Sequence, residues 1–111
     1  MTAFTLGPAL LFCPADRPER FAKAAERADA VILDLEDAVA ADAKAAARGA
    51  LIDSDLDADR VIVRVNPVGT DDHRADLATL SQTDYRTIMV AKAETAQSLT
   101  KVDARFRLVA L

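Results

Sequence analysis

The fold of this chain is decided by residues 30–36, which read AVILDLE. An apolar run typical of a buried strand ends here in Asp34 and Glu36, which lie two residues apart. Successive side chains on a strand alternate between its two faces, so this spacing points both carboxylates the same way. Removing such charges from water costs several kcal/mol unless they are paired. We therefore expect chemistry at the end of this strand.

The same ending recurs after two later apolar runs. Polar residues again stand two apart where each run stops: Arg64 and Asn66 follow residues 61–63, and Lys92 and Glu94 follow residues 88–91. Parallel strands end at one common edge of their sheet. Acids, an arginine and a lysine are thus predicted to converge at that edge.

Strand-like and helix-like segments alternate along the whole sequence. Apolar runs predict strands at residues 10–13, 30–35, 60–65, 87–91 and 106–111. The predicted helices lie between them: one begins near Pro18, one spans residues 41–52, one is capped by Asp71 or Asp72, and one spans residues 95–102. This alternation is typical of a parallel sheet covered by helices. It fits either an open, doubly wound sheet or the first five units of a (β/α)8 barrel, and both place ligands at the carboxyl ends of the strands.

A phospho-acceptor signalling module is the main alternative that an open five-stranded sheet would suggest. Such a module needs an acidic pair after its first strand, an acceptor aspartate ending its third and a lysine after its fifth. Here the first strand ends in Cys13-Pro14-Ala15-Asp16, and the third ends in Arg64-Val65-Asn66. Leu111 lies inside the last strand-like run, so no lysine follows it. The sequence disfavours this module.

Composition narrows the class of protein further. The chain has 111 residues, of which 51% are apolar, so we expect one ordered domain at most. Its net charge is −4 and its basic residues form no stripe, which argues against a nucleic-acid partner. No apolar run approaches the roughly 18 residues of a membrane span, so we expect a cytoplasmic protein. The single cysteine, Cys13, forms no internal disulfide and is expected to be a buried thiol.

Four blocks of sequence carry a resemblance to a known family. They are residues 11–21 (LFCPADRPERF), 31–39 (VILDLEDAV), 63–66 (VRVN) and 91–94 (AKAE). Together they resemble the citrate lyase beta-subunit family of the HpcH/HpaI aldolase superfamily, which includes malyl-CoA and citramalyl-CoA lyases. The resemblance covers the whole chain and implies an α/β fold of the (β/α)8 TIM-barrel type. Residues 1–111 would be the amino-terminal part of one such domain, with about its first five βα units.

The resemblance implies a Mg²⁺-dependent carbon–carbon lyase that is a homo-oligomer when complete. Its substrate would be a 3-hydroxyacyl thioester on CoA or an acyl-carrier protein, such as a citryl, malyl or citramalyl thioester. The products would be a 2-oxo acid and an acetyl thioester. The family's two acidic Mg²⁺ ligands follow the fifth and sixth strands, which places them beyond Leu111, so no metal ligand is expected in this chain. A truncated, catalytically inactive fragment of such an enzyme is the other hypothesis.

The resemblance also implies roles for the acids and the arginine at the strand ends. Arg64 matches the catalytic arginine that binds the substrate's carboxylate and carbonyl oxygens. Glu36 and Asp37, with Asp34, match an acidic block that orients Arg64 and metal-bound water or relays a proton. A structural salt bridge from Arg64 to Glu36 or Asp34 is the alternative, and it is compatible with the catalytic role.

The remaining candidates are residues that could hold the thioester, a lysine–glutamate pair and the single histidine. Phe12, Arg17 and Lys23 match positions that hold the CoA-type thioester, although a solvated helix face explains Arg17 and Lys23 almost as well. Lys92 and Glu94 match a block whose expected role is a buried pair at the barrel mouth. His73 follows two aspartates, but acids at a helix start are more often caps than metal ligands.

Overall fold

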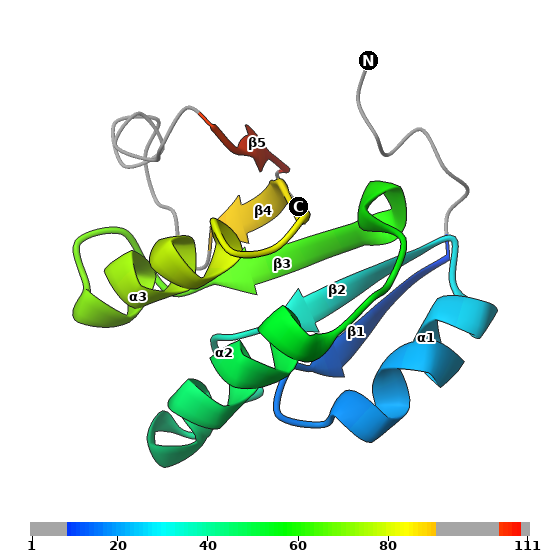
Figure 1. The fold of residues 1–111 in the computed structure, drawn as a ribbon, viewed down its shortest axis with the longest axis horizontal. Helices are drawn as coiled ribbons and strands as arrows, with labels where there is room; N and C mark the ends of the chain where they lie inside the picture. The colour runs from blue at the N-terminus through cyan, green and yellow to red at the C-terminus, as the bar shows by residue number, and fades with distance from the viewer. Residues whose placement is uncertain (1–8, 91–104, 110–111) are drawn as a thin grey trace.

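The computed structural model describes residues 9–90 and 105–109, which form one parallel sheet with helices. Its strands are β1 (Leu10–Pro14), β2 (Ala30–Asp34), β3 (Val61–Val65), β4 (Thr87–Val90) and β5 (Arg107–Leu108). They lie side by side in the order β1-β2-β3-β4-β5, with every neighbouring pair parallel (Figure 1). A doubly wound sheet reverses its strand order around a switch point. The sequential order therefore confirms the barrel prediction over the open, doubly wound sheet.

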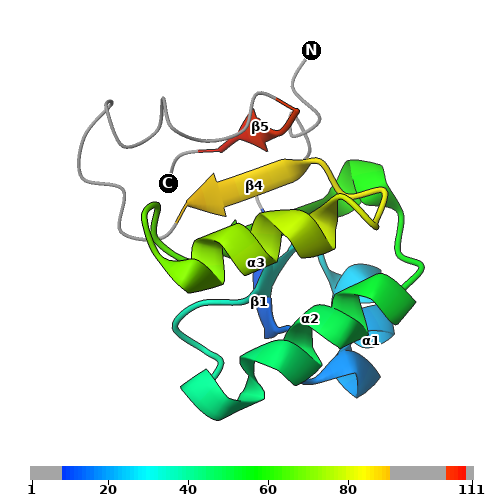
Figure 2. The ribbon, with the colours of Figure 1, turned by 60° about the vertical axis from the view of Figure 1, so that its left-hand side comes forward.

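Within the part of the chain that the structure describes, three α-helices cover one face of this sheet. They are α1 (Phe21–Arg27), α2 (Lys44–Asp53) and α3 (Asp71–Leu80), and short 3₁₀ helices η1 (Pro18–Arg20), η2 (Ala41–Ala43) and η3 (Ala58–Arg60) precede α1, α2 and β3. Turning the molecule shows all three α-helices on the same side of the strands (Figure 2). None of the helices in the described ranges is long and apolar enough to cross a bilayer.

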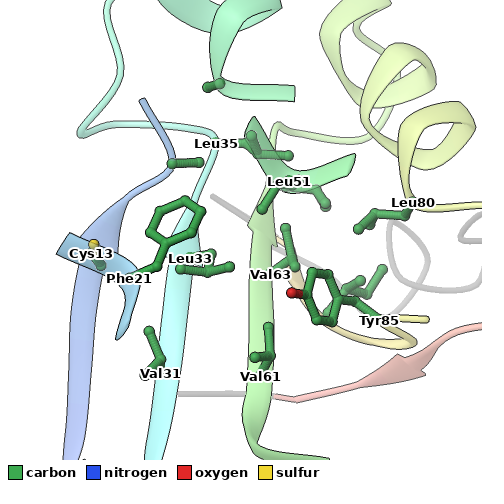
Figure 3. Packing of buried hydrophobic residues seen from close by; sticks show 14 of the residues in the cluster. Cys13, Phe21, Val31, Leu33, Leu35, Leu51, Val61, Val63, Leu80 and Tyr85 are labelled. Carbon is green, nitrogen blue, oxygen red and sulfur yellow. The ribbon is translucent and has the colours of Figure 1, made fainter. Parts of the chain in front are cut away.

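The main core lies between the sheet and these helices. Alternate strand residues point into it, so Val31 and Leu33 of β2 and Val61 and Val63 of β3 are buried against helix and loop side chains. Figure 3 shows this layer, in which the partners from outside the strands include Phe21, Leu51, Leu80 and Tyr85. Fully burying one such side chain is worth about 1.5–3 kcal/mol. Cys13 is buried in the same cluster, as predicted, and burial raises the pKa of its thiol.

The opposite face of the sheet carries the intervening residues. Ile32 of β2, Ile62 of β3 and Met89 of β4 form a second, smaller apolar cluster there, with Val109 packed against it. Two residues further along their strands, the same alternation places Asp34 and Arg64 on this face. The face that would line a barrel interior therefore changes from apolar to charged toward the strand ends.

Several predicted boundaries shift in the structure. β2 ends at Asp34, one residue before the predicted end, and the second helix is divided into η2 and α2. The predicted aspartate cap of α3 is wrong, because the Thr70 hydroxyl accepts the His73 backbone N–H at 3.1 Å. The predicted helix at residues 95–102, and residues 110 and 111 of the predicted last strand, lie outside the described residues.

Candidate functional site

The centre of the site is an ion pair between neighbouring strands. Asp34 ends β2 and is the cross-strand partner of Arg64 on β3, so the two side chains start side by side. Nε of Arg64 donates to Oδ1 of Asp34 at 2.9 Å, and Nη2 donates to Oδ2 at 2.5 Å. Both oxygens are thus bound by one edge of the guanidinium. Two parallel, charge-assisted bonds fix geometry as well as charge.

Asp34 is fully buried and has further hydrogen bonds that hold it ionised. Its Oδ1 accepts the backbone N–H of Glu36 at 2.8 Å, and its Oδ2 accepts that of Ala38 at 3.1 Å. Burial alone would raise the pKa of Asp34, but the hydrogen bonds from Arg64, Glu36 and Ala38 outweigh it and the pKa lies below the usual range. The same bonds tie the loop after β2 to the ion pair.

Asp34 and Phe12 both contact the guanidinium of Arg64. Its hydrogen bonds to Asp34 raise the pKa of Arg64, against the effect of burial, so the side chain stays charged. Its Cζ lies over the Phe12 ring, 5.0 Å from the ring centroid, so the cation contacts the aromatic face. No described residue accepts a hydrogen bond from Nη1, and 23% of the side chain is exposed. Within the described ranges, Nη1 is therefore the part of the guanidinium that no protein acceptor uses.

The two other acids of the block lie beside this pair. Oε1 of Glu36 is 4.0 Å from Nε of Arg64, and only 10% of the Glu36 side chain is exposed. Asp37 is exposed in the loop after β2, and its charge also acts on Arg64. The structure therefore brings Asp34, Glu36 and Arg64 together at one strand end, with Asp37 beside them. The salt bridge expected as an alternative role for Arg64 is present.

Asn66 does not join Arg64, although the spacing predicted a common direction. β3 ends at Val65, so the alternation of faces stops before Asn66. Its side-chain amide donates to the carbonyl of Leu35 at 3.1 Å and to Oδ2 of Asp76 at 2.7 Å. Asn66 thus links the ends of β2 and β3 to α3 on the helical side of the sheet.

Lys44 is one candidate residue of the site that sequence reasoning missed. Its ammonium donates to the carbonyls of Leu35 and Glu36 at 2.8 and 2.9 Å and to Oδ1 of Asn66 at 3.1 Å. These bonds fix the backbone that carries Glu36 and Asp37. The available signal was that Lys44 is the one basic residue in the alanine-rich stretch 41–47.

A second interaction supports this network from α3. Asp76 is fully buried and accepts Nε of Arg48 at 2.9 Å as well as the backbone N–H of Asn66 at 2.8 Å. Arg48 also donates to Oδ1 of Asp72 at 2.7 Å. α2 and α3 are therefore joined by charged groups directly behind the strand ends.

The structure brings together two of the three residues predicted to hold a thioester and leaves the third apart. Phe12 and Lys23 line a groove of about 420 Å³ between the edge strand β1 and α1. Arg17 is exposed and does not line it, whereas Arg20 and Arg27 do. Sequence reasoning missed these two cations, which lie three and ten residues after Arg17 and line the groove in the fold. The groove combines an aromatic wall with three positive side chains.

The described residues do not fit a magnesium ion. No group of three His, Cys, Asp or Glu side chains within residues 9–90 and 105–109 could hold a metal. Both oxygens of Asp34 are already occupied, and Asp72 is paired with Arg48. His73 does not join the aspartates before it: it is buried, and its Nδ1 donates to the Asn66 carbonyl at 2.8 Å. Lys92 and Glu94 lie outside the described residues.

Known proteins resemble this chain along nearly its full length. The model of the HpcH/HpaI aldolase/citrate lyase family matches residues 9–110. A curated citrate lyase subunit beta-like protein of Mycobacterium tuberculosis is 57% identical over 99 residues, which are 89% of this chain and 36% of that protein. The chain thus spans little more than a third of the length of this relative.

Two solved structures from Mycobacterium tuberculosis have the same fold. CitE in complex with magnesium, acetoacetate and coenzyme A is 54% identical, with a TM-score of 0.91 over 96% of this chain and 39% of that one. The citrate lyase beta subunit complexed with oxaloacetate and magnesium is 53% identical, with a TM-score of 0.93 over 99% of this chain and 49% of that one. Both agree with the sequential parallel sheet described above.

Proposed function

This chain belongs to the HpcH/HpaI aldolase/citrate lyase family, and from that premise we propose that it contributes the Arg64 side of a carbon–carbon lyase active site. The observation that carries the proposal is the Asp34–Arg64 pair at the carboxyl end of the sheet. Asp34 binds the Nε–Nη2 edge of the guanidinium, and we propose that the Nη1–Nη2 edge binds the substrate. A charged, immobilised donor edge at the strand ends suits a carboxylate or an oxyanion.

The substrate we propose is a 3-hydroxyacyl thioester, such as a citryl, malyl or citramalyl thioester. In its cleavage the 3-hydroxyl loses its proton, and the bond between the hydroxyl carbon and the carbon next to the thioester breaks. The hydroxyl carbon becomes the carbonyl carbon of a 2-oxo acid. The electron pair passes to the thioester as an enolate, which takes up a proton to give the acetyl thioester. Negative charge therefore develops on oxygen, where a preorganised donor is most effective.

Within this reaction the residues of the chain have separate tasks. Arg64 binds the carboxylate and carbonyl oxygens of the substrate and helps to stabilise the enolate that forms on cleavage. Glu36 and Asp37 orient Arg64 and relay the proton, in line with the 4.0 Å separation of Glu36 from Arg64. Asp34 fixes one edge of the guanidinium and keeps it charged. Lys44 keeps the backbone of the acidic block in place.

The thioester carrier is proposed to lie toward α1. The groove beside Phe12 offers an apolar wall for a pantetheine arm, and Lys23, Arg20 and Arg27 offer cations for phosphates. Arg17, exposed at the start of η1, is proposed as an outer phosphate contact. The relative whose structure contains coenzyme A supports CoA as the carrier.

The complete protein is proposed to use Mg²⁺ and to be a homo-oligomer. Magnesium is present in the related structures named above. Because the described residues do not form its site, we assign the metal ligands to acids outside them. Residues 1–111 are proposed to be the amino-terminal part of a single barrel domain.

The proposal is tested by assaying the full-length protein that contains this sequence. Citryl-, malyl- and citramalyl-CoA are supplied with Mg²⁺, and release of the 2-oxo acid is followed with a coupled dehydrogenase. We expect turnover of at least one thioester, loss of activity on chelation and recovery when Mg²⁺ is restored. A folded protein that cleaves none of the three would contradict the proposed function and favour the inactive alternative.

A further inference from the structure

We propose that Phe12 is a positioning residue for Arg64, which sets the plane of the guanidinium rather than serving mainly as a contact for the thioester carrier. The inference rests on the proposed lyase function and adds a determinant to it. Phe12 belongs to β1, two strands away from Arg64 on β3. The contact between them crosses the strand that carries Asp34.

The register of the sheet explains how this contact arises. Phe12 is the cross-strand partner of Ile32, and Asp34 is the partner of Arg64. Alternation therefore places Phe12, Asp34 and Arg64 on the same face of the sheet. Neighbouring strands lie about 4.8 Å apart, so β1 and β3 are separated by roughly 10 Å. Arg64 must extend over β2 to lie 5.0 Å from the ring centroid, and Phe12 forms the end of that path.

The ring supplies a restraint that Asp34 cannot. The two bonds to Asp34 fix one edge of the guanidinium, but they leave it able to tilt about that edge. An aromatic face against the cation opposes that tilt, because the ring attracts the charge and excludes one side of the plane. The open Nη1–Nη2 edge then keeps a constant direction. A group that must meet a developing charge loses much of its effect when it is misplaced by about 1 Å.

The contacts of Phe12 within the described residues agree with this role. Phe12 belongs to neither apolar cluster of the sheet, and the contact recorded for its ring is the one with Arg64. Leu10 lies two residues earlier on the same face of β1 and is 40% exposed. Leu10 has no aromatic ring and so cannot form a cation–ring contact with Arg64. It therefore provides a matched position for measuring the general effect of trimming this strand.

Two roles for Phe12 predict different kinetics. A contact with the carrier acts on binding, so its loss raises KM for the CoA thioester, and this effect disappears with a short thioester that lacks the pantetheine arm. A positioning residue acts on the stabilisation of charge, so its loss lowers kcat with both substrates. Replacing Phe12 by another aromatic residue would keep kcat near the wild-type value, because a ring face still contacts Arg64.

The test compares Phe12→Leu, Phe12→Tyr and the control Leu10→Ala in the full-length protein. Each is assayed with a CoA thioester and with a simple alkyl thioester of the same acid, which lacks the pantetheine arm. We expect Phe12→Leu to lower kcat about tenfold with both substrates, as loss of a cation–ring contact allows. Phe12→Tyr should recover most of that loss, and Leu10→Ala should match the wild type. An effect of Phe12→Leu confined to KM for the CoA thioester would overturn the proposal.

A second measurement keeps this inference separable from the proposed function. The Nε–H resonance of Arg64 is followed by NMR in protein labelled with ¹⁵N at arginine, without substrate. The ring current of Phe12 should shift this resonance, so Phe12→Leu should move it and Leu10→Ala should not. If the wild type cleaves no thioester, the proposed function fails while this spectrum still reports the contact. An unchanged Arg64 resonance in Phe12→Leu would overturn the inference on its own.

Discussion

Replacing Asp34 with Asn tests how strongly the ion pair holds the site together. The substitution keeps size and shape but removes the charge that Arg64 neutralises. It also exchanges one carboxylate oxygen for an N–H donor. Both oxygens of Asp34 accept two hydrogen bonds each in the structure. In Asp34→Asn, the new side-chain NH₂ group would therefore face two N–H donors, one from Arg64 and one from the backbone.

The structure sets the size of the expected loss. Removing one partner of a buried ion pair typically costs 3–5 kcal/mol, because the remaining charge is left uncompensated. Arg64 retains 23% exposure and can be partly hydrated, so we expect about 3 kcal/mol, the lower end of that range. Domains are commonly stable by about 5–15 kcal/mol, so the variant should still fold. At a urea dependence of about 3 kcal/mol per molar, the unfolding midpoint should fall by about 1 M.

The assay is urea unfolding of the full-length protein, followed by circular dichroism at pH 7. Asp55→Asn is the matched control, since Asp55 is exposed in the loop after α2 and has no ion pair with a described residue. The control should leave the midpoint unchanged. A shift for Asp34→Asn below about 0.3 M, equivalent to roughly 1 kcal/mol, would refute the reasoning that the pair is a buried, stabilising one.

The pH dependence gives an independent check on the same residue. The pKa of Asp34 is lowered in the folded protein from a reference value of 3.8, so its contribution is fully present above that value. The contribution is lost as pH falls through the folded pKa, because protonation then favours the unfolded chain. The gap between wild type and Asp34→Asn should stay constant from neutral pH down to the unfolded value and shrink below it. A gap that disappears while the pH is still near neutral would contradict the assigned pKa direction.

Three further predictions concern other parts of the chain. Lys23→Ala and Arg17→Ala should mainly raise KM for the CoA thioester, with the larger effect at Lys23 because it lines the groove; equal kcat losses in both would contradict this. Lys44→Met should lower kcat about tenfold with little change in KM, since the acidic loop loses its anchor, and Lys44→Arg should recover part of it. Thr70→Ala should cost about 1 kcal/mol of stability through the lost α3 cap, measured by urea unfolding.

Sequence patterns were sufficient for the sheet because the relevant interactions are local or periodic. The apolar runs fixed which segments are strands, and alternation of faces correctly grouped Asp34 with Arg64. The same alternation was wrong for Asn66, since a strand must continue through a residue for the rule to apply and β3 ends at Val65. A prediction of direction at a strand end therefore depends on a boundary that sequence locates only to within a residue or two.

Interactions between distant segments were the part that the sequence did not reveal. Lys44 reaches carbonyl groups of Leu35 and Glu36, and backbone carbonyls leave no signature in a sequence. The pairing of Phe12 with Arg64 depends on strand order and register together. Arg20 and Arg27 join the groove through the turn of α1 against β1 rather than through any motif.

The central claim is that Arg64 acts at the reacting centre, and Arg64→Lys in the full-length protein tests it most directly. Lysine keeps the charge but loses the planar fork, so it cannot bind Asp34 and a substrate oxygen in the same geometry. Steady-state cleavage of a malyl or citramalyl thioester is measured with Mg²⁺, after circular dichroism shows that the variant is folded. We predict a loss in kcat of about 10²–10³-fold, as for removal of a donor to a developing oxyanion. A kcat within about threefold of the wild type would contradict the account and leave Arg64 with only its structural pairing to Asp34.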